Sequence, residues 1–169
     1  MKSLFFLVKL RENKANLYIT AMEITKSVES KNKFLCNIEV DNLQPERLYG
    51  GTQDNNTIRT LTGGSSDWNS IIGGDGFHVN VDPNNNDYVY GESQFGNLRR
   101  STNGGNNFTS ATDGIDSGDR NNWNTPVILS PFDSEVLYYG SNKLYSSDKA
   151  VFWTAISPDL TDGQHPSGS

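Results

Sequence analysis

The feature that most constrains the fold of this chain is an internal repeat with a period of about 40 to 50 residues. Three Tyr-Gly pairs recur, 41 and 49 residues apart, each with a proline upstream and an aromatic residue downstream. A repeat of this size predicts stacked copies of one small supersecondary unit. In chain order the prolines, tyrosines and closing aromatics are Pro45, Tyr49 and Trp68; Pro83, Tyr90 and Phe108; and Pro131, Tyr139 and Trp153.

The middle unit predicts four short strands, because its residues alternate and are rich in β-branched and aromatic side chains. Four short antiparallel strands in about 40 residues form a blade of a β-propeller. We therefore predict an all-β chain that is a partial β-propeller of about three four-stranded antiparallel blades. The strands expected in the middle unit are Phe77–Val81, Tyr88–Glu92, Asn97–Ser101 and a weaker fourth at Asn107–Ser110.

Composition agrees with short strands joined by many turns. The 169 residues include 16 Gly and 20 Asn, which favour turns and exclude a helical bundle. The 18 aromatic residues argue against disorder. Asp82–Asp87, "DPNNND", is expected to join the first two strands of the middle unit. The alternation of oxygen ligands in this segment also resembles half of a calcium loop, but no Gly follows at the sixth position and Ser93 stands at the twelfth, so no metal is expected.

The charge distribution argues against nucleic acid as a partner. The formal net charge is -6; residues 1–36 carry +4 and residues 37–169 carry -10. Binding phosphates requires a clustered basic surface, which an acidic body does not provide. We expect residues 1–36 to be a basic segment outside the blades, residues 37–161 to form the blades, with Lys33–Val40 as the candidate first strand, and residues 162–169 to be a flexible tail.

The single cysteine, Cys36, excludes an intrachain disulfide and a cysteine-based zinc site, and fits a small buried apolar residue. Met1–Leu10 begins like a secretory signal, yet its apolar run, Leu4–Val8, is shorter than the usual 7 to 15 residues or so. No apolar stretch approaches the roughly 20 residues that cross a membrane. We therefore expect no membrane span. We also expect no cofactor.

The hairpins before the closing aromatics carry the most specific pattern. Ser101–Phe108 reads Ser-x-Asn-x-Gly-x-x-Phe, Ser146–Trp153 reads Ser-x-Asp-x-Ala-x-x-Trp, and Thr60–Trp68 is a looser copy with one residue inserted. These segments resemble the Asp-box, Ser-x-Asp-x-Gly-x-x-Trp, of BNR repeats in sialidase-like and sortilin-like β-propellers. Asp or Asn can bond nearby amides, Gly can take positive φ and an aromatic ring can seal the turn. The resemblance covers about Asp41 to Thr161.

The resemblance implies several functions, because this repeat serves sialidase and xyloglucanase types of glycoside hydrolase, photosystem assembly factors and non-catalytic receptors alike. It also implies an extracellular or cell-envelope location. Three blades cannot close a ring, so we expect the remaining blades of a longer chain, or self-association through open blade edges. We expect a non-catalytic module that recognises protein or carbohydrate, as part of a larger bacterial BNR-repeat protein; the alternative is part of a glycoside hydrolase.

For the hydrolase alternative, the candidate catalytic residues are Asp75 and Asp54, since two carboxyl groups must flank the scissile bond. Asp75 lies in "GGDG", which leads into the strand expected to line the central channel; the competing interpretation is a tight turn whose amides Asp75 binds. A sialidase would instead need three clustered arginines, but the adjacent Arg99 and Arg100 should point to opposite faces of their strand.

The candidate ligand-binding residues are Asp75, His78, Gln53 and Trp123. His78 is expected to be a channel-lining or partly buried polar residue. Gln53 recurs as Gln94 after the Tyr-Gly strand, which favours a structural hydrogen bond repeated in each blade over ligand contact. Trp123 lies in a long loop between blades and is expected either to stack on a sugar ring or to pack against a neighbouring blade.

Overall fold

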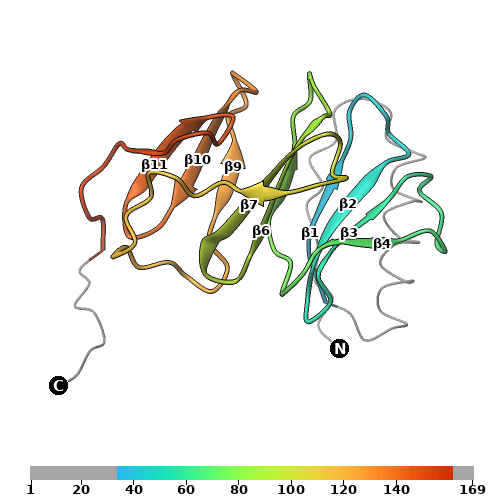
Figure 1. The fold of residues 1–169 in the computed structure, drawn as a ribbon, viewed down its shortest axis with the longest axis horizontal. Helices are drawn as coiled ribbons and strands as arrows, with labels where there is room; N and C mark the ends of the chain where they lie inside the picture. The colour runs from blue at the N-terminus through green and yellow to red at the C-terminus, as the bar shows by residue number, and fades with distance from the viewer. Residues whose placement is uncertain (1–33, 162–169) are drawn as a thin grey trace.

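The computed structural model describes residues 34–161 and shows three four-stranded antiparallel sheets side by side in chain order (Figure 1). The expected signal-like start, most of the basic N-terminal segment and the tail lie outside the described residues. Blade 1 consists of β1 (Phe34–Val40), β2 (Leu48–Gln53), β3 (Thr57–Thr60) and β4 (Asn69–Ile72). Blade 2 consists of β5 (Val79–Val81), β6 (Tyr88–Ser93), β7 (Asn97–Thr102) and β8 (Thr109–Ser110). Blade 3 consists of β9 (Val127–Leu129), β10 (Val136–Gly140), β11 (Leu144–Asp148) and β12 (Thr154–Ala155).

Each blade is a meander in which every strand pairs with the next one along the chain. The predicted all-β fold of three four-stranded blades is therefore confirmed. A single turn of 3-10 helix, Gln94–Gly96, joins β6 to β7. Within residues 34–161 no helix is long and apolar enough to cross a membrane. Cys36 lies half-buried in β1, where burial raises the pKa of its thiol.

The loops between the first and second strands repeat the same turn in all three blades. In each, a side-chain oxygen at the start of the loop accepts hydrogen bonds from the amides two and three residues ahead: Asp41, Asp82 and Ser130 occupy this position. The carboxylate of Asp82 is thus used by the turn, at 2.9 Å from the amide of Asn84. Among the described residues no cluster of three His, Cys, Asp or Glu side chains could hold a metal.

The strand registers correct one detail of the sequence repeat. The last pairs between the first and second strands are Val40–Leu48, Val81–Val89 and Leu129–Leu137. The next residue along the second strand is Tyr49 in blade 1, Tyr90 in blade 2 and Tyr138 in blade 3. The alignment on Tyr139 was therefore wrong by one residue, because the third blade has adjacent tyrosines and Tyr139 occupies the place of Gly50 and Gly91.

The hairpin between β7 and β8 is organised by Ser101, whose Oγ accepts the amides of Asn103 at 3.2 Å and Gly105 at 2.9 Å. Gly104 and Gly105 both have positive φ, 68° and 81°. In blade 3 the equivalent backbone positions are Lys149 and Ala150, with φ of 51° and 49°. The residue equivalent to Ser101 is Ser147, because Ser147 pairs with Leu137 as Ser101 pairs with Val89. The hairpin that follows is therefore one residue shorter in blade 3 than in blade 2.

The core consists of layers between neighbouring blades. Blades 1 and 2 bury Tyr49, Val79, Val81 and Val89 between them. The layer between blades 2 and 3 is larger and more aromatic, and contains Tyr90, Leu98, Ala111, Val127, Leu137, Tyr139, Tyr145, Ala150 and Trp153. Aromatic side chains bury large areas, so this second layer contributes more to the stability of the described part of the chain.

Candidate functional site

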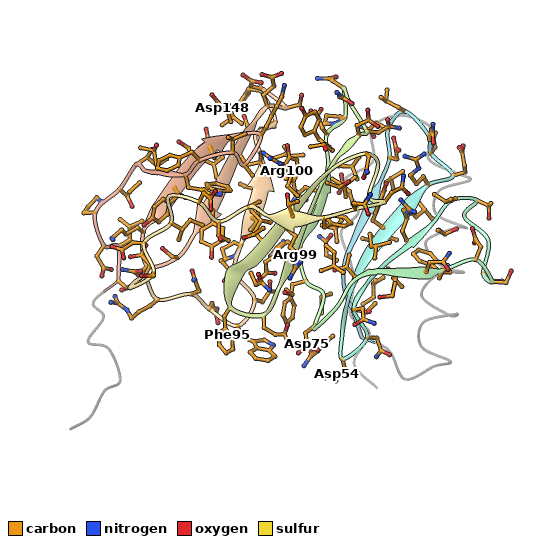
Figure 2. All side chains as sticks on the ribbon, in the orientation of Figure 1. Asp54, Asp75, Phe95, Arg99, Arg100 and Asp148 are labelled. Carbon is orange, nitrogen blue, oxygen red and sulfur yellow. The ribbon has the colours of Figure 1, made fainter. Side chains whose placement is uncertain are left out.

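The candidate site lies at the end of the blades where the chain crosses from one blade to the next, which we call the crossover end. The connection between blades 1 and 2, residues 73–78, reaches this end, as do the connection 111–126 between blades 2 and 3 and the hairpins that join the second and third strands. Asp54, Asp75 and Phe95 all lie at this end, opposite the end that carries Asp148 (Figure 2). Loops on a rigid sheet scaffold often carry binding residues.

Asp75 is held by the turns around it. Its Oδ1 accepts the backbone amide of Asp54 at 2.5 Å, and its own amide donates to Oε1 of Gln94 at 3.0 Å. Asp75 is only 9% exposed, whereas the Asp54 side chain is exposed at the hairpin tip with φ of 61°. The carboxylate of Asp75 therefore fixes the connection 73–78 against blade 1.

The contact of Gln94 has an equivalent in blade 3. There Oδ1 of Asn142 accepts the amide of Arg120 at 2.8 Å, so the side chain that follows the second strand again binds the connection leading into its own blade. Gln53 occupies the same position in blade 1, and its side chain is exposed. The structure thus gives Gln94 and Asn142 a structural hydrogen bond and leaves the Gln53 side chain at the surface.

Glu92 ties blade 2 to blade 3 from a fully buried position. Its Oε1 accepts the amides of Gly96 and Thr125 at 3.2 Å each, and its Oε2 accepts the amide of His78 at 3.4 Å. Burial nevertheless raises the pKa of Glu92 to about 7. The imidazole of His78 is half-buried, and burial lowers its pKa.

Trp123 stands beside Phe95 and Phe77 at the crossover end. The rings of Trp123 and Phe95 meet edge to face with centroids 4.8 Å apart, and Phe77 lies 6.1 Å from Trp123. The amide of Phe95 also donates to the carbonyl of Trp123 at 3.0 Å. Phe77 is buried, while Trp123 remains 41% exposed and Phe95 58% exposed. Trp123 therefore packs against blade 2 and still presents ring surface to solvent beside Phe95.

The structure brings Asp54 and Asp75 into contact and places Trp123 beside Phe95. Sequence reasoning did not select Phe95 or Glu92. Phe95 has φ of 58°, a conformation that bulky residues rarely adopt and that the sequence pattern does not reveal. Its position in "SQFG", a turn-like sequence with one aromatic residue, is the available signal. Glu92 lies in a strand where Gly is found in the other two blades, at Gly51 and Gly140, and that difference is a signal for a local role.

Comparison with known proteins supports the fold. No protein-family model matches the chain, and no curated protein matches it. The structure of a GH74 enzyme from Niastella koreensis superposes on 74% of this chain with a TM-score of 0.56 and 21% identity, and the match covers 23% of that enzyme. The likeness at this identity concerns the propeller fold alone.

Two further solved structures are more distant. An ancestral GH74 enzyme matches 73% of this chain with a TM-score of 0.42 and 16% identity, over 24% of its own length. YCF48 from Cyanidioschyzon merolae matches 73% with a TM-score of 0.37 and 13% identity, over 56% of its own length. The chain thus spans about a quarter of the two GH74 enzymes and little more than half of YCF48.

Proposed function

We propose that this chain is a non-catalytic carbohydrate-recognition module, part of a longer β-propeller, which binds sugar rings through Phe95 and Trp123. The observation that carries the proposal is the exposed pair of rings at the crossover end, held by the edge-to-face contact and by the bond from the Phe95 amide to Trp123. Exposed aromatic faces suit the apolar faces of sugar rings. We further propose that the Ser101 hairpin and its counterparts are Asp-boxes of BNR repeats.

The contacts of Asp75 support a non-catalytic role. A glycoside hydrolase needs two carboxyl groups that flank the bond, about 5 Å apart for retention or about 6.5 to 9.5 Å apart for inversion. Asp75 instead binds the amide of Asp54 and is almost buried. The second candidate function, part of a glycoside hydrolase, is favoured by one observation, the proximity of these two acidic residues at the crossover end.

The proposal is tested by measuring binding of cellohexaose and of xyloglucan oligosaccharides by titration calorimetry. Trp123→Ala and Phe95→Ala should each weaken binding about tenfold or more, since each removes a stacking surface. Phe132→Ala is the matched control: Phe132 is 97% exposed but lies in the β9–β10 loop, at the end of the blades opposite the ring pair, and the variant should bind like the wild type. Equal losses in all three variants, or no binding of either probe by the wild type, would overturn the proposal.

Hydrolysis is followed separately through the release of reducing ends from the same xyloglucan oligosaccharides. We expect no release by the wild-type chain. Release that disappears in both Asp75→Asn and Asp54→Asn would establish the hydrolase alternative in place of the non-catalytic role.

A further inference from the structure

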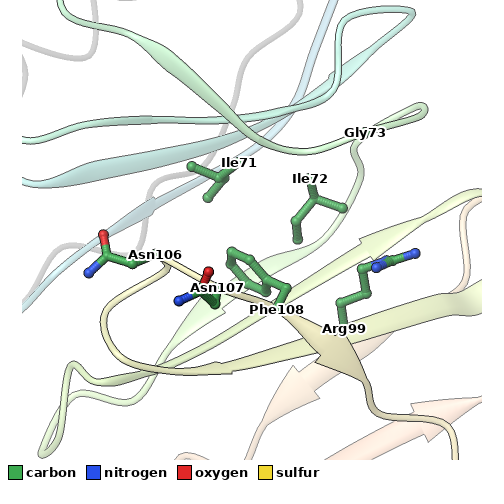
Figure 3. Close-up of a pocket in the computed structure, with 7 residues that line it drawn as sticks. All are labelled: Ile71, Ile72, Gly73, Arg99, Asn106, Asn107 and Phe108. Atoms are coloured by element: carbon green, nitrogen blue, oxygen red, sulfur yellow. The ribbon is translucent and has the colours of Figure 1, made fainter.

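A cleft of about 520 Å³ opens on the outer rim between blades 1 and 2, and its lining includes neither Phe95 nor Trp123. Ile71 and Ile72, at the end of β4, line one wall, and Phe108 faces them from blade 2 (Figure 3). Arg99 of β7 stands at one end of the cleft, and Asn106 and Asn107 stand at the other (Figure 3). This volume lies within the range of sites for small ligands or sugar units.

Arg99 carries a positive charge that no side chain of residues 34–161 neutralises. Each of the ion pairs in this part of the chain uses another basic residue: Arg47, Arg120, Lys143 or Lys149. Arg100, the next residue, points the other way, and its Nη1 donates to the carbonyl of Lys149 at 2.8 Å. Arg99 pairs across the strands with Gly91, where an added Cβ would lie 2.4 Å from Ile72, so Arg99 belongs to the face of blade 2 that borders the cleft.

The two asparagines at the end of the cleft opposite Arg99 differ in how their side chains are hydrogen-bonded. Asn106 is engaged by blade 1, since its Oδ1 accepts Nη2 of Arg59 at 3.1 Å and its Nδ2 donates to the carbonyl of Asn103. Asn107 is anchored through its backbone amide, which donates to Oδ1 of Asn103 at 3.0 Å, and its own side chain is exposed. The side-chain amide of Asn107 therefore offers one donor group and one acceptor to a ligand.

We propose that this rim cleft binds a carboxylate-bearing sugar unit, a uronic acid residue within an acidic polysaccharide. The guanidinium of Arg99 suits a carboxylate, which it can hold through two parallel hydrogen bonds. Phe108 and the two isoleucines provide an apolar surface for the face of a sugar ring, and Asn107 provides hydrogen-bonding groups for ring hydroxyls. An acidic peptide is less suited, because β8, Thr109–Ser110, is too short for a peptide strand to pair along it.

This site goes beyond the proposed function, because its residues are different from Phe95 and Trp123. The test measures binding of trigalacturonate and of its methyl ester, which keeps the sugar backbone but lacks the charge. The wild-type chain should bind trigalacturonate at least about tenfold more tightly than the ester. Arg99→Ala should abolish that preference, and Arg99→Lys should restore only part of it, since a lysine cannot form the two parallel bonds.

Lys149→Ala is the matched control, because it also removes one positive charge but from the β11–β12 hairpin of blade 3. It should keep the preference for trigalacturonate, and circular dichroism should show that every variant remains folded.

Binding of the acid and the ester with equal affinity, or an Arg99→Ala variant that behaves like the wild type, would overturn the proposal. Binding of hexaglutamate with no binding of trigalacturonate would assign the cleft to acidic peptides and would also overturn it. The Trp123→Ala variant should bind trigalacturonate normally, so this test and that of the ring pair can fail independently.

Discussion

The two layers between blades are built from equivalent strands but differ at their outer rims. Between blades 1 and 2 the connection is short, residues 73–78, and the rim holds the open cleft beside Ile72 and Phe108. Between blades 2 and 3 the longer connection, residues 111–126, passes across the rim. There Trp153 Nε1 donates to the carbonyl of Ala111 at 2.7 Å, and the amide of Trp153 donates to the carbonyl of Asp113 at 2.8 Å.

This difference follows the length of the connection, because the longer connection is the one that covers its rim. Ala111 and Ile115 from the longer connection pack against Trp153 and Tyr145, so the second rim is filled by the chain itself. Among residues 34–161 no segment covers the first rim in this way. The two junctions of the same repeat therefore differ in how far the chain itself covers the outer rim.

The largest difference between the layers should appear on removing the closing aromatics. Trp153→Ala should lower the free energy of unfolding by about 4 kcal/mol, because it empties a buried site and removes an indole hydrogen bond. Phe108→Ala should cost about 2 kcal/mol, since Phe108 is only partly buried at the open rim. Urea denaturation of both variants measures the two decreases in the free energy of unfolding. Equal decreases would show that the two rims are packed alike.

A smaller effect concerns two glutamates at the junctions between blades, fully buried Glu92 and partly buried Glu39. Burial raises the pKa of Glu92 to about 7, above the ordinary value of 4.5, so the folded protein favours the protonated form. Protonated Glu92 therefore stabilises the folded state, fully below pH 4.5, and this stabilisation is lost as the pH rises through 7. The free energy of unfolding should fall by about 3 kcal/mol over this range because of Glu92. Glu92→Gln should remove this part of the pH dependence. The measurement is the free energy of unfolding of the wild type and the variant from about pH 4 to about pH 8.

Glu39 is the matched residue at the junction of blades 1 and 2. It accepts the amide of Val81, and burial raises its pKa to about 7 as well. Glu39→Gln should therefore remove a second part of the same slope, and the double variant should show the flattest profile. A slope unchanged in both single variants would mean that other groups govern the pH dependence.

The smallest effect compares two glycines at the same blade position. An added Cβ at Gly51 would lie 1.9 Å from the carbonyl oxygen of Phe77, whereas at Gly140 the nearest atom is Cγ of Pro126 at 3.1 Å. Gly51→Ala should cost about 2 kcal/mol, because the backbone of the short connection cannot move aside, and Gly140→Ala should cost about 0.5 kcal/mol or less. Thermal unfolding measures both variants: a larger drop in Tm for Gly51→Ala than for Gly140→Ala would show that the backbones pack more closely at Gly51.

The blades were predictable because alternation marks each strand and turn residues mark their ends. Even the 3-10 turn at Gln94–Gly96 falls at an expected strand junction. The repeat misplaced Tyr139 because Tyr138 and Tyr139 are adjacent, and only the pairing with Ile128 and Val127 distinguishes them. Asp75 was selected as a candidate from its place in "GGDG", but which amide it binds depends on the fold of the neighbouring hairpin. The exposure of Phe95 and the cleft at Arg99 depend on distances between blades, which sequence spacing does not encode.

The left-handed backbone of Phe95 has a consequence for the energetics of the proposed recognition. A bulky residue with φ of 58° is strained, and here the neighbouring contacts with Trp123 and the bond from its amide hold it in place. The ring is therefore ordered before any ligand arrives. A flexible aromatic would lose about 0.5 to 1.5 kcal/mol of side-chain freedom on binding. The edge-to-face contact with Trp123 already restricts the Phe95 ring in the folded chain, so under the proposed function the stability of the blades supplies part of the affinity of the ring pair.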